Sequence, residues 1–375
     1  MDSAVLPAGK LQIRTWSAEE FAASRRAWGE LLHTSDADPL FMSWDWQWRW
    51  WLHHAGPLGA TLRILAAYAG STLVGLVPFY SRQVLVRGIF PSLRWEFIGI
   101  AWRDRDAVFS DYLDMIVQRE HRNAVLAAIA AWLASEPLWD ELVLCCTRRD
   151  GAACEFARSH LSRMAYVREI DPLSAWCAQL PPRLEHYIER LASDARRKMF
   201  NHRRKLVDPR IEYAAESDIP DYLGSLWSWV SERWGRSPQR PGFREFHLDL
   251  AACMAQADRL RLSRLSIPEG PLSFMYNIRT GDTIYYLQSA FDATRGFGLS
   301  PGYLHFGYAI EAAYREGAAR FDLLAGPGRH RDYKPDLLTE RVPVVTYHAV
   351  RGAVARVLYR AYELASGCRR YLRSF

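Results

Sequence analysis

Hydrophobic and polar positions follow two periodic patterns along this chain of 375 residues. Alternation with period two predicts a strand, and apolar residues that recur every three to four positions predict a helix. Strands are expected at residues 11–16, 61–70, 72–83, 93–100, 111–117 and 139–146, and again at 210–215, 259–267, 271–280, 282–292, 319–326 and 342–350. Helices are expected after Ser17 and at residues 43–51, 121–135, 151–164, 189–206, 219–235, 242–257, 301–316 and 351–375.

The second half of the chain repeats the order of elements of the first half. This repeat predicts an α/β (α+β) fold of two domains, each a mixed twisted sheet flanked by helices. Pro181 and Pro182 interrupt any regular element, so the linker is placed there. The expected domains are residues 1–180 and 181–350, followed by a basic amphipathic helix at 351–375.

Composition is that of a globular protein, with 49% hydrophobic and 24% charged residues, and the formal charge of +6 favours anionic ligands. The six cysteines form no CxxC pair and none lies beside a histidine at metal-ligand spacing, so we expect reduced thiols and no metal. Residues 1–16 lack the apolar core of a signal peptide, and the longest apolar run, 124–134, is far shorter than the ~20 residues of a membrane span. We therefore expect a cytoplasmic protein.

Three unusual segments each admit two interpretations. Five tryptophans within residues 43–51 lie at helical spacing, which is typical of core packing, although so many also suit an interface or a groove. The basic helix at 189–206 suits phosphates or a solvated face; no base-reading module accompanies it, so no specific nucleic acid is expected. Residues 351–375, with six arginines and one glutamate, suit peripheral association with an anionic membrane or docking on the helix's own domain.

A glycine-rich loop joins the predicted strand at 282–292 to the predicted helix at 301–316. Ser300 is a good N-cap, and Pro301 suits the first helical position. A strand, a glycine loop and a helix N-terminus together make a favourable site for pyrophosphate, although such a loop also serves as a simple turn. The residues of interest here are Arg295, Gly296, Gly298, Ser300 and Gly302.

Residues 299–336 resemble the GNAT-type acyltransferases of the FemAB-like branch, in particular the CelD-like group of cellulose-biosynthesis acetyltransferases. The matching motif consists of Ser300-Pro301-Gly302, Gly317, Phe321-Asp322, Gly326 and Tyr333-Lys334. The basic segment at 189–206 and the tryptophan-rich N-terminal part are also similar, so the resemblance extends over about residues 40 to 336. The chain departs from the family pattern after Lys334: the family often has an aromatic residue soon after this position, and here Pro335-Asp336-Leu337-Leu338 follows.

The resemblance implies two tandem GNAT-like domains, with an acyl donor site in the second and none in the first. The donor implied is acyl-CoA, with an acetyl or a longer chain, and the acceptor a small-molecule amine. Residues that the resemblance assigns to the donor are Leu287, Gln288, Arg295, Gly296, Gly298, Ser300, Gly302 and Tyr303.

Direct attack of an amine on a thioester requires a base for the ammonium and an acid for the leaving thiolate. Asp322 is the candidate base, and Tyr333 is the candidate acid. Tyr286, Gln288 and Lys334 are candidate contacts to the acceptor. A structural tyrosine, and an Asp322 that only pairs with Lys334 or Arg320, are the alternatives. His305 is not expected to act as a base, since a helix N-terminus disfavours a charged imidazolium.

Three functions remain open at this point. The first is an acyl-CoA-dependent N-acyltransferase in cell-envelope, exopolysaccharide or lipid metabolism. The second is an aminoacyl-tRNA-dependent transferase of the FemAB type, and the third is a non-catalytic accessory protein of polysaccharide biosynthesis with a degenerate acyl site. The intact glycine loop favours an active enzyme.

Overall fold

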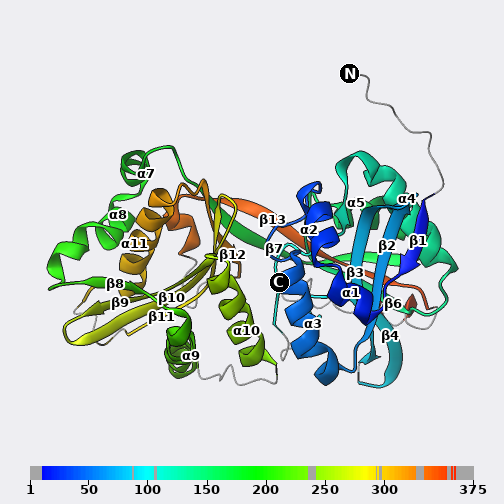
Figure 1. Cartoon of the computed structure of the whole chain (residues 1–375), viewed down its shortest axis with the longest axis horizontal. Helices are drawn as coiled ribbons and strands as arrows, with labels where there is room; N and C mark the ends of the chain where they lie inside the picture. Colours follow the sequence, from blue (N-terminus) through cyan, green and yellow to red (C-terminus); the bar gives the residue numbers. More distant parts are fainter. Residues whose placement is uncertain are drawn as a thin grey trace, which may run out of the picture. The chain divides into compact units, whose positions relative to one another are not determined.

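The computed structural model describes residues 11–86, 88–104, 108–234, 242–292, 294, 298–326, 333–352, 356, 357 and 359 (Figure 1). The chain divides into two compact units. The first consists of Met1–Pro172 together with Val344–Phe375, and the second of Leu173–Pro343. This division differs from the one expected from sequence at its ends, because residues 173–180 join the second unit and the last strand joins the first.

The first unit is a mixed sheet covered on both faces. Along β3, Gly75 lies against Val125 of α4, whereas the ring of Tyr80 packs on Trp50 of α3 on the opposite face. Its strands are β1 Gln12–Thr15, β2 Thr61–Ala69, β3 Thr72–Val86, β4 Phe90–Phe97, β5 Ile116–Val117 and β6 Glu141–Arg148. Its helices are α1 Ala18–Ala23, α2 Arg25–His33, α3 Trp44–Leu58, η1 Arg119–His121, α4 Arg122–Ser135, α5 Ala152–Phe156, the π-helical η2 Ala157–Leu161 and α6 Ser162–Met164.

The second unit is also a mixed sheet between helices. Neighbouring residues of β10 point to opposite faces: Phe274 packs on Tyr222 of α9, and Met275 lies in the core with Phe306 and Ile310 of α11. Figure 1 shows α9 and α10 on one side of this sheet and α11 on the other. The elements are α7 Leu184–Arg190, α8 Ser193–Met199, η3 Asn201–Lys205, β8 Arg210–Tyr213, η4 Glu216–Asp218, α9 Ile219–Trp234, α10 Phe243–Gln256, β9 Leu260–Ile267, β10 Gly270–Thr280, β11 Thr283–Phe291, α11 Pro301–Arg315, β12 Arg320–Ala325 and η5 Lys334–Leu337.

Two long strands pass from one unit to the other. Ala175–Gln179 at the end of β7 (Tyr166–Gln179) pair with β12 of the second unit. Val344–Val350 at the end of β13 (Thr339–Val350) pair with β6 of the first unit. The prediction that residues 342–350 close the second sheet is therefore wrong for Val344–Val350, and β7 is not predicted at all. Each half contributes a strand to the other sheet, which period-two alternation does not reveal.

Within the described residues the predicted element order is otherwise confirmed, with two local corrections; most of the helix expected at 351–375 lies outside them. The strand expected at 111–117 is reduced to β5, since Tyr112 has a φ of 54°, which a strand does not accommodate. The basic helix expected at 189–206 is wrong as one element, because Leu191 and Ala192 are extended and separate α7 from α8. Burial of Leu191 in the core of the second unit accounts for the break.

The tryptophan-rich helix α3 serves mainly as a packing element. Ser43 caps it by accepting a hydrogen bond from the N–H of Trp46 at 3.2 Å. Trp46 and Trp50 are fully buried, and their indole N–H groups donate to Ser110 Oγ and to the carbonyl of Val108. Trp44 and Trp48 are half-buried and stacked, with centroids 5.6 Å apart, so core packing accounts for two of the five tryptophans fully.

Candidate functional site

The glycine loop leads directly into α11, as the sequence predicts. Gly298 has a φ of 73° and nothing within 4 Å of the position of a Cβ, so the loop turns there with its backbone open. Ser300 occupies the N-cap position, although its side chain accepts no capping hydrogen bond. The N–H of Leu304 is bonded to the carbonyl of Ser300, and the amides before it belong to the first turn, which a helix leaves without an internal partner. Arg295 and Gly296 lie outside the described residues.

Two glycines allow α11 to approach its neighbours closely. A Cβ on Gly302 would lie 3.2 Å from two ring carbons of Phe291 at the end of β11. A Cβ on Gly307 would lie 2.4 Å from the carbonyl oxygen of Met199, at the end of α8. Gly302 therefore fixes the N-terminus of α11 beside β11, and Gly307 fixes α8 against the same helix.

Strands β11 and β12 are parallel only at their beginnings. Thr283–Tyr285 pair with Arg320–Asp322, and no further residue of β11 pairs with β12 within the described chain. Beyond this point β11 remains paired with β10, and one residue of β11, Leu287, is left over between the Tyr276–Gln288 and Asn277–Tyr286 pairs. The strands thus separate next to Tyr286, Leu287 and Gln288, and in the described part of the chain β11 forms no ladder with β12 beyond Tyr285.

The extra residue at Leu287 changes which side chains share a face. Tyr286 and Ser289 are three positions apart and would point to opposite faces of a regular strand. With the bulge between them, the Tyr286 hydroxyl and Ser289 Oγ form a hydrogen bond of 2.7 Å. The hydroxyl of Tyr333 in turn donates to that of Tyr286 at 3.3 Å. Three hydroxyl groups therefore form a chain beside the point where β11 and β12 separate.

Aromatic rings hold this hydroxyl chain in place. Phe306 of α11 lies 5.0 Å from the ring of Tyr286 and 5.7 Å from that of Tyr333. Tyr303, in the first turn of α11, lies 6.4 Å from Tyr333, and its hydroxyl donates to Asp336 Oδ2 at 2.6 Å. The structure therefore brings Tyr303, which is predicted to bind the acyl donor, together with Tyr333, which is predicted to be catalytic.

Asp322 and Lys334 lie buried beneath this region and hold the end of β12. Asp322 Oδ1 accepts the N–H of Leu324 at 2.7 Å, and Leu324 has a φ of 57°, so β12 bulges here. Lys334 Nζ donates to the carbonyls of Leu324 and Ala325 at 2.8 and 3.0 Å. Both side chains thus position β12; their predicted roles as base and acceptor contact remain predictions. Arg320, the other candidate partner of Asp322, pairs with Asp282 at 2.8 Å.

A basic side chain borders the first turn of α11. Lys198 Nζ lies 5.3 Å above the ring of Tyr303, and it also pairs with Asp194 at 2.5 Å. Arg197 pairs with the same carboxylate, whose pKa these two hydrogen bonds lower to about 2. The basic face of α8 thus borders the candidate anion site.

His305 is a structural residue of α11. Its Nε2 and Nδ1 lie 2.9 and 2.7 Å from the hydroxyls of Ser263 and Ser273, on β9 and β10. Complete burial lowers the pKa of His305 to about 3, so the imidazole is neutral. The expectation that it is not a base agrees with this position.

Because His305 is neutral in the folded protein, acid is expected to destabilise the second unit. A histidine takes up its proton near pH 6.5 in the unfolded chain, whereas His305 in the folded protein does so only near pH 3. The contribution of neutral His305 to the free energy of unfolding is therefore fully present above pH 6.5 and decreases as the pH falls from 6.5 to 3. At pH 5 the loss should be about 2 kcal/mol. Chemical denaturation at pH 7 and 5 measures it. His305→Gln should reduce the pH dependence of the free energy of unfolding by this amount.

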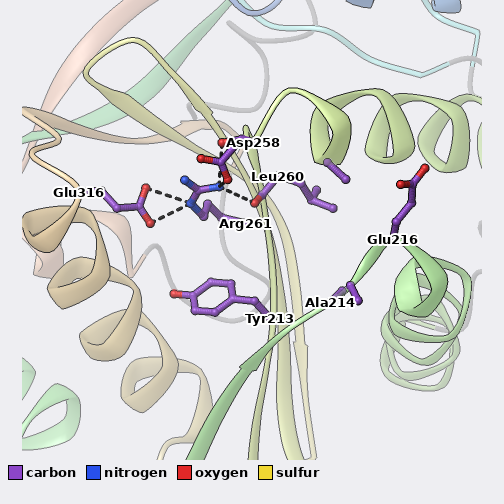
Figure 2. Close-up of a pocket in the computed structure, with 9 residues that line it drawn as sticks. Tyr213, Ala214, Glu216, Asp258, Leu260, Arg261 and Glu316 are labelled. Carbon is purple, nitrogen blue, oxygen red and sulfur yellow. Dashed lines mark hydrogen bonds and ion pairs between the residues drawn. The ribbon is translucent and has the colours of Figure 1, made fainter.

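A cavity of about 450 Å³ lies elsewhere in the second unit, between β8, β9 and the end of α11 (Figure 2). Arg261 spans it and is neutralised internally: its Nε lies 2.8 and 2.9 Å from the two carboxylate oxygens of Glu316, and it also pairs with Asp258. Glu216 accepts a hydrogen bond from Gln256. Three carboxylates and one guanidinium line the cavity, a balance that does not favour an anionic donor, and no predicted site residue lines it, so we place the candidate site at the separation of β11 and β12.

Comparisons with known proteins concern the fold of the chain and the family that its second unit resembles. Residues 193–335, inside the second unit, match the Acetyltransferase (GNAT) domain family. The sequence has no significant match among curated proteins. The crystal structure of FemX covers 93% of this chain and 99% of its own, with 10% identity and a TM-score of 0.62. A conserved protein of unknown function from Bacteroides thetaiotaomicron VPI-5482 covers 91% and 99%, with 13% identity and a TM-score of 0.54.

The predicted fold of two tandem GNAT-like domains is therefore confirmed. The match over residues 193–335 supports a transferase of the GNAT type. The closer resemblance to the CelD-like group remains a prediction. Among the described helices, none combines the length and apolar character that crossing a bilayer requires.

Sequence reasoning did not identify two residues of the site, Ser289 and Asp336. Ser289 reaches Tyr286 only through the bulge at Leu287, which the alternating pattern conceals. Asp336 lies in the segment after Lys334 that departs from the pattern of the resembled family, and it accepts a hydrogen bond from the hydroxyl of Tyr303.

Proposed function

We propose that this protein is an N-acyltransferase that transfers an acyl group from acyl-CoA to a small-molecule amine. One observation carries the proposal: the hydroxyl of Tyr333 lies between the open end of β11 and the first turn of α11. An anionic donor held at the N-terminus of α11 would place its thioester toward the separated strands, because the two sites adjoin through Tyr303 and Phe306.

The residues of this site suit the donor. The first-turn amides of α11, the open backbone at Gly298 and the positive end of the helix dipole favour pyrophosphate. Lys198 adds a cation beside Tyr303. The backbone N–H groups of Leu287 and Gln288, residues that do not pair with β12, are the proposed donors of hydrogen bonds to the thioester carbonyl.

The reaction needs two proton transfers, for which we propose separate groups. The amine nitrogen bonds to the thioester carbon, and the bond from that carbon to sulfur breaks. Tyr333 donates its hydroxyl proton to the leaving thiolate. Because the Tyr333 hydroxyl is hydrogen-bonded to that of Tyr286, which is hydrogen-bonded to Ser289, a proton can then return to Tyr333 along these hydroxyl groups. Asp322 is the proposed base or orienting group for the ammonium of the acceptor.

Ligand titration tests the donor class. Thermal unfolding of the full chain is measured with coenzyme A, with acyl-CoAs of increasing chain length and with aminoacylated tRNA. Stabilisation by an acyl-CoA is expected, because a ligand that binds only the folded state raises the free energy of unfolding, by about 2.7 kcal/mol at a ligand concentration of a hundred times Kd. The unfolding temperature rises accordingly. Stabilisation by aminoacylated tRNA alone would contradict an acyl-CoA donor.

An aminoacyl-tRNA-dependent transferase is the second candidate. The structural similarity to FemX and the basic residues of α8 favour it. In the same titration, this function would appear as stabilisation by aminoacylated tRNA that weakens steeply with salt, since phosphate contacts release counterions. A role in cell-envelope, exopolysaccharide or lipid metabolism, including cellulose biosynthesis, is proposed for the enzyme on the sequence resemblance alone.

A further inference from the structure

A half-buried arginine in the first turn of α10 has no anionic partner. The guanidinium carbon of Arg244 lies 5.2 Å above the ring of Trp227 in α9. Among the described residues Arg244 forms no ion pair, and its Nε is shielded from solvent without a hydrogen-bond acceptor. A cation–π contact orients a guanidinium but does not neutralise its charge. A positive charge that is partly removed from water and left unpaired is costly, so Arg244 indicates a site for an anion that the chain itself does not supply.

A second polar group without a partner belongs to the same group of aromatic rings. Tyr276 is 1% exposed, and its hydroxyl has no hydrogen-bond partner within the described chain. Its ring lies 5.8 Å from that of His247, which lies 6.3 Å from that of Trp227. Buried hydroxyl groups in native proteins are nearly always hydrogen-bonded, so this one also points to a bound ligand. We call these four residues the α10 cluster: Trp227, Arg244, His247 and Tyr276.

The α10 cluster adjoins the separation of β11 and β12 from the face of the sheet opposite to α11. Tyr276 pairs with Gln288, and residues that are paired across two strands share a face, so both side chains point toward α9 and α10. Tyr286, on the other side of the bulge, packs on Phe306 of α11. Gln288 is half-buried and makes no hydrogen bond through its side chain to the part of the chain that the structure describes. The proposed donor lies on the α11 face, so the α10 cluster and Gln288 lie where an acceptor would approach the thioester from the other face.

We propose that the acceptor is an amine that also carries a carboxylate, and that Arg244 binds this carboxylate. The inference rests on the proposed function, because it assigns the acceptor of that reaction. A guanidinium presents paired N–H groups that match the two oxygens of a carboxylate, and the Tyr276 hydroxyl is a further donor to the same ligand. One guanidinium neutralises one negative charge, which suits a carboxylate better than a phosphate monoester with a charge of about −2. The substrate class is therefore an amino acid or an amino-acid-like compound.

Pairs of amines that differ only in the carboxylate test this inference. The protein amino acids and their decarboxylated amines, such as phenylalanine with phenethylamine and lysine with cadaverine, are supplied with acyl-CoA, and the release of coenzyme A is measured in steady state. We expect kcat/KM to be about 10- to 100-fold higher for the carboxylated member of an accepted pair, which is the range for a hydrogen bond to a charged group. Failure to acylate any carboxylated amine, although acyl-CoA binds, would overturn the inference.

Substitution of Arg244 should remove this preference. Arg244→Gln removes the charge and should bring the two values of kcat/KM of a pair close together, whereas Arg244→Lys keeps the charge without the paired donors and should retain part of the difference. Arg264→Gln is the matched control. The Arg264 guanidinium carbon lies 5.0 Å above the ring of Tyr222 in α9, but Arg264 is paired with Glu212 at 2.8 Å, so the preference should not change.

Tyr276→Phe distinguishes ligand binding from a structural role. The substitution removes a hydroxyl that has no partner within the described chain, so thermal unfolding should occur at the same temperature or a higher one. The KM for the carboxylated amine should nevertheless increase about tenfold, because one hydrogen bond to the carboxylate is lost. A lower unfolding temperature with an unchanged KM would exclude Tyr276 from the acceptor site.

Binding without turnover separates this inference from the proposed function. Thermal unfolding of the full chain is measured with each amine alone and with acyl-CoA alone. Turnover of acyl-CoA with equal kcat/KM for both members of every pair, or a preference that Arg244→Gln retains, would overturn the carboxylate assignment and leave the acyl-CoA function standing. Stabilisation by an amino acid that Arg244→Gln abolishes, without any response to acyl-CoA, would overturn the proposed donor and support the carboxylate site.

Discussion

Ser300→Asp is expected to weaken binding of coenzyme A about 10- to 100-fold while leaving the protein as stable as before. Aspartate is a favoured N-cap residue, and a negative charge at a helix N-terminus is favourable, so α11 should form at least as well. The same charge repels a pyrophosphate at that helix end: two unit charges ~4 Å apart repel by ~1 kcal/mol in water and by more where water is partly excluded. Calorimetric titration gives the affinity, and thermal unfolding gives the stability.

Ser300→Asn is the matched control for this experiment. Asparagine is also a good N-cap and carries no charge, so it should retain the affinity of the unaltered protein for coenzyme A. The serine side chain makes no capping hydrogen bond here, and its loss by itself should have little effect. If Ser300→Asp binds coenzyme A normally, the pyrophosphate does not lie at the N-terminus of α11.

Tyr333→Phe is expected to lower kcat about 100-fold with little change in KM. The substitution removes one hydroxyl from the separation of β11 and β12 and keeps the ring that packs on Phe306. Proton transfer from a positioned acid contributes roughly 10²- to 10⁴-fold to the rate. The thiol product is measured in steady state, with acyl-CoA as the donor and the amine acceptor that the titration and product analysis identify.

A donor with a more acidic thiol distinguishes acid catalysis from a structural effect. Its thiolate leaves readily without a proton, so the loss caused by Tyr333→Phe should become much smaller with this donor. Tyr314→Phe serves as the control, because it removes a hydroxyl from α11 on the side that packs on Tyr187, which is not part of the hydroxyl chain. An equal loss with both donors would exclude Tyr333 as the acid and leave it a packing role.

The candidate site was predictable from sequence where the chemistry lies in one continuous segment. Gly298, Ser300, Pro301 and α11 are local features: a turn of positive φ, a cap position and an apolar stripe depend on neighbours a few residues away. In the structure the motif residues Asp322 and Lys334 both hold the end of β12. Their individual roles were not predictable, because Lys334 contacts the carbonyls of Leu324 and Ala325, and such contacts depend on a bulge of β12.

The sequence by itself determined the α/β class, the two similar halves, most of the described helices and the glycine loop, because these follow from the spacing of residues along the chain. Only the tertiary structure decided the rest. The exchange of β7 and β13 between the sheets depends on pairing between residues that are far apart in the chain, such as Val350 with Glu141. The contact between Tyr286 and Ser289 depends on one unpaired residue, Leu287, which has no signature in the alternating pattern. Local propensity fixes an element, whereas the partner across a sheet is selected by the packing of the whole unit.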